Sequence, residues 1–316
     1  MAHEVETMMS VREKPWHYEL TKDVTKIIQN APNSYEALVA AGLNWEVEAK
    51  PVSVAGTDEA IPNYVANVRN SDGKVLGIVT NRYKIVQNVE AFAFTDTLIG
   101  GDVRYETAGS LFGGRKVWML ARLGDRKIAG DETEQYLCFS NTHDGTGAVN
   151  VMVTPVRVVC NNTLNMAVSA AKRTWSVRHV GDINSKIAEA KRCLELADEY
   201  MDALDVRAVE MANITIDEDA LMKALGKVFG KVDDDASDRE KRNNQKKYDD
   251  FTVCYLAPDI AKFHGTAWGA VNAMADYIDH GEPGRQSANY AENNWARIMG
   301  GHAMLDDFAA ALAGKH

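Results

Sequence analysis

The sequence has few of the features that mark a secreted, membrane-spanning or zinc-binding protein. Its four cysteines stand at positions 138, 160, 193 and 254, and no two of them form a CxxC pair, which argues against a disulfide framework or a cysteine zinc site. No apolar run reaches the roughly 18 residues that a membrane span needs. Residues 1–14 lack the apolar stretch of a signal peptide. We therefore expect a soluble cytoplasmic protein with reduced, buried thiols.

Familiar catalytic signatures are missing as well. The sequence has no GxxxxGK[ST] loop, no GxGxxG after a strand, no HExxH and no GxSxG. His143-Asp144, in a glycine-bearing loop, is the best local candidate for a metal or acid–base pair, but a lone dipeptide is more typical of a turn with a polar tip. These absences favour a non-catalytic protein with no cofactor and no bound metal ion. An enzyme with an unfamiliar site stays an alternative.

Hydrophobic periodicity predicts strands in the first half of the chain. Residues 45–49, 64–68 and 75–79 have strand patterns, and Asp72-Gly73 predicts a tight hairpin between the last two. Further strands are expected at 116–123, 134–139 and 148–159, and helices at 34–42 and 88–99. The fold class expected is α+β, with an antiparallel β-rich N-terminal and central region, packed helices, and a helical C-terminal region.

The period changes to that of a helix beyond Gly181. Amphipathic patterns predict helices at 183–204, 267–278 and 290–312, while residues 231–250 carry many charges and no apolar stripe, as in an exposed helix or a mobile loop. The chain thus divides into an irregular N-terminal arm, a β-rich α+β core domain and a helical C-terminal region, at residues 1–33, 34–180 and 181–316.

The net charge of −10 counts against nucleic acid as a partner, because a uniformly acidic protein repels phosphates. The charge is uneven, however. Residues 104–180 carry 10 Lys and Arg against 6 Asp and Glu, an excess of +4, and residues 181–316 carry 16 against 25, which gives −9. The central stretch is therefore the part to consider for phosphate contacts, although a solvated mixed surface explains such an excess equally well.

Basic and aromatic residues are interleaved along this stretch and just before it. Cations track the phosphates of a single strand, and exposed rings stack on its bases. Lys116 and Arg122 share one side of a predicted strand, which suits a groove along a sheet. The competing interpretation places the rings in the core and the cations at strand edges. The candidate nucleic-acid-binding residues are Arg82, Tyr83, Lys84, Arg115, Lys116, Trp118, Arg122, Arg157, Lys172 and Arg173.

Four stretches carry a resemblance to a known family. They are residues 1–8 with 15–17, residues 81–88 (NRYKIVQN), residues 155–164 (PVRVVCNNTL), and residues 266–270 (TAWGA) with 279–280. On these the chain resembles the phage/plasmid-like proteins, a family of unknown function encoded by mobile elements. The resemblance implies a mobile-element origin and a place inside the bacterial host cell, but no activity. Residues 293–295 and 300–301 depart from the family pattern, which puts a role for the last helix in doubt.

The order of elements is also similar, over a shorter stretch, to the core of single-strand annealing proteins. A helix that leads into residues 42–47, strands with a hairpin, and a further helix are typical of phage recombinases of the Red-beta, RecT and Erf kind and of the eukaryotic Rad-type annealing protein. This likeness implies rings or filaments, a basic groove that holds single strands, and no nucleotide cofactor. Fold alone does not fix function.

The leading expectation is a non-catalytic single-stranded DNA-binding or annealing protein of a phage or plasmid, active in recombination or replication as a homo-oligomer. Two other classes stay open. One is a protein–protein interaction factor, for example in counter-defence, that binds a phage or host protein through the acidic C-terminal region. The other is an enzyme that acts on nucleic acid or nucleotides, with His143 and Asp144 at its site.

Overall fold

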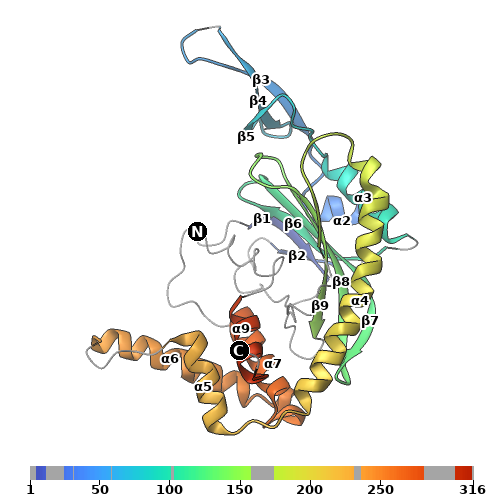
Figure 1. Ribbon diagram of the computed structural model, residues 1–316. Coiled ribbons are helices and arrows are strands. Elements are labelled where there is room, and N and C mark those ends of the chain that lie inside the picture. The colour runs from blue at the N-terminus through green and yellow to red at the C-terminus, as the bar shows by residue number, and fades with distance from the viewer. Residues whose placement is uncertain are drawn as a thin grey trace. The chain divides into compact units, whose positions relative to one another are not determined.

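A computed structural model describes residues 5–11, 25–30, 32–57, 59–100, 103–157, 174–230, 236–280 and 303–314 (Figure 1). The chain forms two compact units, each assembled from several segments. The sheet unit comprises Met1–Gly124, Tyr136–Val153 and Lys172–Ala197, and the helical unit comprises Asp125–Gln135, Thr154–Ala171 and Asp198–His316. The division into segments 1–33, 34–180 and 181–316 stays a prediction.

Seven of the described strands form the larger sheet, in the order β10-β9-β8-β7-β6-β1-β2. Their bounds are Val5–Ser10 (β1), Thr25–Ile27 (β2), Tyr105–Leu111 (β6), Lys116–Ile128 (β7), Asp131–Thr142 (β8), Val149–Arg157 (β9) and Thr174–Val177 (β10). The β6–β7, β9–β10 and β1–β6 pairs are antiparallel, and β1–β2 is parallel. Antiparallel pairing with a helical C-terminal region confirms the predicted α+β class.

The prediction of an irregular N-terminal arm is wrong for Val5–Ser10, which form the strand β1. β1 lies between β6 and β2 in the sheet, and Met8 and Met9 are 1% and 0% exposed. Its ladder partner β6 is far away in sequence, with Met8 opposite Gly109. A six-residue strand whose partner is so distant leaves no hairpin signal in the local pattern, which is why the sequence suggested an arm.

The smaller sheet is a meander of three antiparallel strands, β3 (Val47–Ser53), β4 (Ala60–Arg69) and β5 (Val75–Thr80). The predicted hairpin joins β4 to β5, and Gly73 has the positive φ of 74° that the turn requires. The pairing places Asn67 opposite Gly77. Both residues of this pair contact the segment at residues 143–144.

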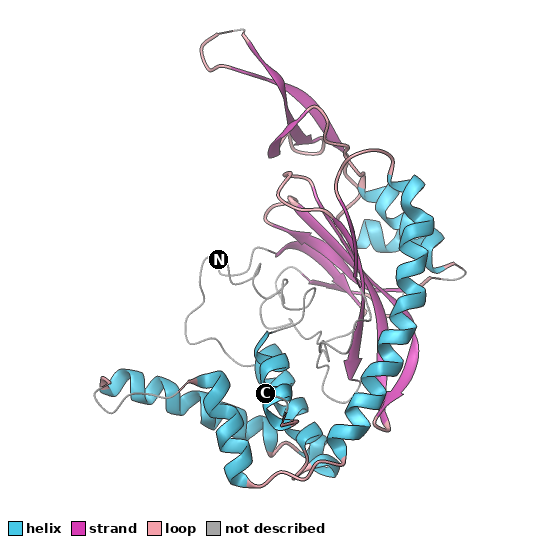
Figure 2. Ribbon diagram, in the orientation of Figure 1, coloured by secondary structure: helices cyan, strands magenta, loops and turns pink. Residues whose placement is uncertain are grey.

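Two helices cover one face of the larger sheet, α2 (Ser34–Ala40) and α3 (Asn88–Ile99) (Figure 2). Each begins with a capping box, formed by Asn33 with Glu36 in α2 and by Gln87 with Glu90 in α3. The helices are those predicted over residues 34–42 and 88–99, although α2 ends two residues earlier, at Ala40.

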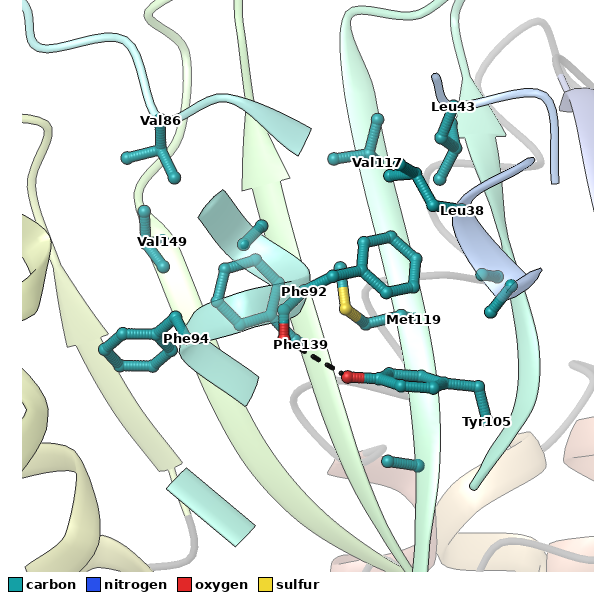
Figure 3. Close-up of a cluster of buried hydrophobic side chains, with 14 of the residues drawn as sticks. Leu38, Leu43, Val86, Phe92, Phe94, Tyr105, Val117, Met119, Phe139 and Val149 are labelled. Carbon is teal, nitrogen blue, oxygen red and sulfur yellow. Dashed lines mark hydrogen bonds between the residues drawn. The ribbon is translucent and has the colours of Figure 1, made fainter. Parts of the chain in front are cut away.

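The core of the sheet unit lies between these helices and the sheet. Figure 3 shows Phe92 of α3 packed among side chains from several strands, and ring centroids of Phe92 and Tyr105 are 5.0 Å apart. The buried Tyr105 hydroxyl donates a hydrogen bond to Asp96 at 2.8 Å and also lies 3.3 Å from the Phe92 carbonyl oxygen. Its polar end is therefore satisfied inside an apolar cluster.

The helical unit has its own apolar core. Its helices are α4 (Ile187–Ala212), α5 (Glu218–Phe229), α6 (Asp238–Tyr255), α7 (Ala267–His280) and α9 (Ala303–Leu312), with short 3₁₀ turns at Ile183–Lys186 and Pro258–Phe263. The first turns of α4 belong to the sheet unit. Trp268 and Phe308 are among the largest fully buried side chains. Within the charged stretch 231–250, the described residues from 238 onward are helical, capped by Ser237.

None of the described helices is both long enough and apolar enough to span a bilayer. Of the cysteines whose side chains the structure describes, Cys138 is buried and Cys254 is half-buried. Burial raises the pKa of both thiols, so neither is activated as a nucleophile.

Candidate functional site

Two of the predicted basic segments, far apart in sequence, meet at one end of the larger sheet. The Tyr83 hydroxyl, in the loop between β5 and α3, donates a hydrogen bond to the carbonyl oxygen of Thr142, at the end of β8. The next residue, His143, donates its backbone N–H to the carbonyl oxygen of Arg115, just before β7, at 2.7 Å. Residues 82–84 and 115–116 therefore flank the same short segment of chain.

The end of β10 joins this arrangement. The backbone N–H of Lys84 donates to the carbonyl oxygen of His179 at 2.9 Å. The rings of Tyr83 and His179 are stacked, with centroids 4.4 Å apart and planes 16° apart. One face of Tyr83 is thus covered by His179, and its hydroxyl is engaged, so this ring positions the loop more than it offers a surface to a base.

The turn before β7 fixes the second basic pair. Phe112 has an unusual positive φ of 55°, and its carbonyl oxygen accepts a hydrogen bond from Nε of Arg115 at 3.0 Å. The Arg115 guanidinium and the Lys116 ammonium each lie 5.9 Å from the Phe112 ring centroid, within the range of a cation–π contact. Both charges are held close to the turn.

Trp118 does not serve as a stacking platform. The sequence places Lys116, Trp118, Leu120 and Arg122 on one side of a strand, but Trp118 is 3% and Leu120 is 6% exposed. No open groove therefore runs between the two cations. Trp118 and Leu120, which lie between the two cations on this side of the strand, belong to the interior, as large apolar groups generally do. This corrects the predicted role of Trp118 and the predicted groove along β7.

The remaining predicted residues lie away from this end of the sheet or outside the described residues. Arg122 is exposed and six positions along β7 from Lys116, about 20 Å in an extended strand. Arg157 is the last residue of β9, and its side chain is not described. Lys172 and Arg173 fall outside the described residues.

His143 is the central residue of a buried polar cluster. It is 0% exposed, and its ring lies edge-on to Trp45 with centroids 5.3 Å apart. Its Nε2 lies 3.1 Å from Oδ1 of Asn88, the first residue of α3. The expected turn with a polar tip is therefore wrong for His143. The strand β8 ends at Thr142, and the next side chain still points into the interior.

The hydrogen bonds of Asn88 settle which ring nitrogen of His143 carries the proton. Nδ2 of Asn88 donates to the carbonyl oxygen of Leu43 at 2.9 Å, so Oδ1 is the atom that faces the ring, and Nε2 must be the donor. Burial, and to a smaller extent the ring of His179, lowers the pKa of His143 to about 3. The imidazole is neutral, and Nδ1 keeps a lone pair.

His179 also has one ring nitrogen that is hydrogen-bonded and one that is not, but here Nδ1 is the bonded nitrogen. Its Nδ1 lies 3.0 Å from the carbonyl oxygen of Lys84, which can only accept, so Nδ1 carries the proton. Burial lowers the pKa of His179, while the hydrogen bond to Lys84 and the charge of Asp144 oppose that shift. Its Nε2 is buried and has no hydrogen-bond partner among the described residues.

Two asparagines complete the cluster. Nδ2 of Asn67 donates to the carbonyl oxygen of His143 at 2.7 Å, and Nδ2 of Asn141 donates to that of Val86 at 3.0 Å. Both side chains are 0% exposed. In the part of the chain that the structure describes, Oδ1 of each lacks a hydrogen-bond partner, as does the hydroxyl of Thr142. Unpaired buried polar atoms are rare in native proteins, and each needs an explanation.

A close backbone approach holds the loop of residues 143–147 against the smaller sheet. A Cβ on Gly77 would lie 2.5 Å from Cα and 2.8 Å from the carbonyl oxygen of Asp144, so only glycine fits there. The Asp144 carboxylate accepts from the N–H of Thr146 at 2.9 Å and from its hydroxyl at 2.7 Å. Asp144 is therefore occupied by its own turn and is not poised as an acid or base.

Sequence reasoning missed most of this cluster. Asn67, Asn88 and Asn141 carry no local signal, because a single asparagine in a strand or at a helix start is ordinary. His179 has no local signal other than its place next to Arg178. Among the described residues, no three His, Cys, Asp or Glu side chains gather as metal ligands, so a motif search on those types also passes over it.

A family model described as a domain of unknown function, DUF932, matches residues 75–298. The matched segment contains the basic pairs, His143, Asn141 and His179, and begins after Asn67. The chain matches no curated protein and no solved structure. The match extends over more than two thirds of the chain and carries no ligand or reaction with it.

Proposed function

This chain belongs to the DUF932 family, and we propose that it binds single-stranded DNA without catalysis, as an annealing protein of a phage or plasmid active in recombination or replication. The observation that supports the proposal is the meeting of residues 82–84 and 115–116 at one end of the larger sheet. Arg82, Lys84 and Arg115 are exposed there. We call these cations, together with Lys116, the basic end.

Among the described residues, the cations of the basic end are not balanced by ion pairs. In the described part of the chain, none of its four cations forms an ion pair with a carboxylate. Arg69 and Arg126 differ, because each is bound to two carboxylates. Arg178, next to His179, adds another exposed cation. Unpaired cations grouped in space are what phosphate binding requires.

An exposed aromatic ring lies beside the basic end. Tyr64 of β4 is 48% exposed and pairs with Thr80, and the neighbouring Asn81 donates its N–H to the Asn63 carbonyl oxygen at 3.0 Å. The chain continues from there to Arg82. We assign to Tyr64 the stacking role that the sequence gave to Trp118, because a base can reach an exposed ring.

In this proposal the cations neutralise phosphates and leave the base edges free to pair. No cofactor is needed, and annealing requires two strands in register, so the proposal includes a homo-oligomer. The acidic residues 181–316, at −9, repel DNA and so confine it to the basic end.

Binding of a phage or host protein through the helical unit is the second candidate. Its support is three exposed apolar side chains of this unit, Val206 at 60% and Val209 at 44% on α4, and Met222 at 48% on α5. Exposed apolar groups amid acidic residues favour a protein partner with apolar and basic residues. Recovery of a defined partner from nuclease-treated lysate, lost in Val206→Asp, would support this candidate.

The test of DNA binding is fluorescence anisotropy of a labelled strand of about 30 nucleotides and of the matching duplex, at low and moderate salt. We expect tight, salt-sensitive binding that prefers the single strand. Replacing Arg115 and Lys116 together with Ala should flatten the slope of log affinity against log salt by about 1.4, since each phosphate contact to a single strand contributes about 0.7.

The matched control removes the same charge elsewhere. Lys50 is paired with Glu48 and Lys127 with Glu132, and both lysines are exposed, so Lys50→Ala with Lys127→Ala lowers the net charge equally without touching the basic end. Equal losses in both double variants would mean a diffuse charge effect. Absence of any binding at low salt would refute the proposal, because electrostatic attraction is strongest there.

A further inference from the structure

Four of the five unpaired atoms of the buried polar cluster share one chemical property, and the fifth, the Thr142 hydroxyl, can both donate and accept. Nδ2 of Asn67 and of Asn141 each faces a backbone carbonyl oxygen, so the amide orientation is fixed, and the atom left over is Oδ1, an acceptor. The atoms left over on His143 and His179 are Nδ1 and Nε2, each the unprotonated nitrogen of its ring. All four unpaired atoms are therefore electron-pair donors without a proton.

These four groups belong to neighbouring parts of one fold. Asn67 binds the backbone of His143, and Asn141 lies two residues before it. His179 stacks on Tyr83, and Tyr83 binds the carbonyl oxygen of Thr142, the residue before His143. Each of the four side chains is at least nine-tenths buried, so bulk water does not satisfy these atoms.

Both histidines also have the environment of a metal ligand. Imidazoles that bind metals donate their second N–H to a fixed oxygen, which sets the tautomer and aims the free nitrogen. His143 does so through Nε2 to Asn88, at 3.1 Å, and His179 through Nδ1 to Lys84, at 3.0 Å. The asparagine oxygens can provide further ligands or hold a metal-bound water.

We propose that this cluster binds a divalent transition-metal ion through Nδ1 of His143 and Nε2 of His179. Imidazole nitrogen favours zinc, nickel, cobalt or copper over magnesium and calcium, which prefer sets of oxygen ligands. The ion would join the ends of β8 and β10 to the smaller sheet. The inference does not depend on DNA binding.

The first measurement uses the unaltered full-length chain, purified without a histidine tag. Elemental analysis should find about one transition-metal ion per chain, and the chelator-treated protein should take up one Co²⁺ with new visible absorption bands. The proton NMR spectrum of the Co²⁺ form should show two strongly shifted exchangeable N–H resonances, one from each ring, because each ligand keeps its second N–H bonded to protein oxygen.

Variants then assign the ligands. His143→Gln and His179→Gln should each weaken Co²⁺ binding at least tenfold. His264→Gln, which alters an exposed histidine of the helical unit, should bind Co²⁺ as the unaltered chain does. If either variant at the site fails to fold, the count of shifted N–H resonances in the unaltered protein still decides the matter.

Two outcomes would overturn the proposal. The first is the absence of any ion at isolation together with no stoichiometric uptake of Co²⁺, Zn²⁺ or Ni²⁺, which would leave ordered water as the partner of the four atoms. The second is uptake that His143→Gln and His179→Gln leave unchanged, or that shows no shifted imidazole N–H, since the ion would then lie elsewhere.

Discussion

The guanidinium of Arg69 binds both carboxylate oxygens of Glu6, through hydrogen bonds of 2.8 and 2.9 Å that join β4 of the smaller sheet to β1 of the larger one. The same guanidinium also holds Asp72 at 2.6 and 3.0 Å and lies over the Trp45 ring at 5.4 Å. Arg69 is therefore a structural cation, in contrast to those of the basic end.

Replacing Arg69 with Ala should lower the free energy of unfolding by about 2 kcal/mol, because a bidentate, largely buried charge pair is lost and Glu6 is left without its partner. Chemical denaturation measures the change. The control is Lys50→Ala, which breaks an exposed pair with Glu48 and should cost less than about 0.5 kcal/mol. Equal losses would mean that Arg69 does not join the sheets.

The same contact predicts a pH dependence. Hydrogen bonds from Arg69 lower the pKa of Glu6 below its usual value, and those from Arg69 and Lys74 lower the pKa of Asp72 to about 2. A carboxyl group with a depressed pKa stabilises the fold above its unfolded pKa, near 4, and loses this contribution as the pH falls through the folded value.

Glu6→Gln should therefore reduce the fall in stability between about pH 4.5 and pH 2. Urea unfolding at several pH values in that window provides the measurement, and Glu48→Gln, at an exposed pair, is the control. A Glu6→Gln profile parallel to that of the unaltered chain would contradict the assignment of the shift to Glu6.

Gly77→Ala should destabilise the sheet unit by about 2 kcal/mol, the cost of overpacking, because its Cβ would collide with backbone atoms of Asp144. The signal of His143 in a histidine-selective NMR spectrum should shift, since the loop must move. Gly124→Ala is the control, because a Cβ there meets nothing within 4 Å and Gly124 lacks a positive φ. A shift in both variants or in neither would refute the loop contact.

Substitution of Trp118 should affect the stability of the fold, whereas substitution of Tyr64 should affect DNA binding. Trp118→Ala should lower the unfolding free energy by about 3–5 kcal/mol, since the ring is 3% exposed. Tyr64→Ala should leave stability almost unchanged and weaken single-strand binding by about 1–3 kcal/mol, the contribution of one stacked base. Binding that withstands the loss of Tyr64 would remove the stacking role from this ring.

Much of the fold follows from local pattern. The hairpin at Gly73 and the helix over 88–99 have signals within a few residues, namely a turn dipeptide and a capping box. β1 was missed because only β6, far along the chain, makes its six residues a central strand. Trp118 was misplaced because alternation shows which residues share a side of a strand but not which side is covered.

The site was predictable only in part. Arg82 and Arg115 stand out as cations near aromatic residues, but their meeting depends on hydrogen bonds to the segment that follows β8. The buried cluster depends on contacts of Asn67, Asn141 and His179 with backbone atoms distant in sequence. No spacing rule relates these residues, so only the folded arrangement shows that their unpaired atoms are all of one kind.

The central position of β1 also constrains folding during synthesis. The ribosome makes β1 before β6, and at about 5–20 residues per second the intervening chain takes roughly 5–20 s to appear. For that time the strand has an unsatisfied edge that could pair with other nascent chains. Glu6 places a charge within it, which opposes such pairing. The charge thus protects the nascent strand, and in the folded chain its pairing with Arg69 fixes the place of β1.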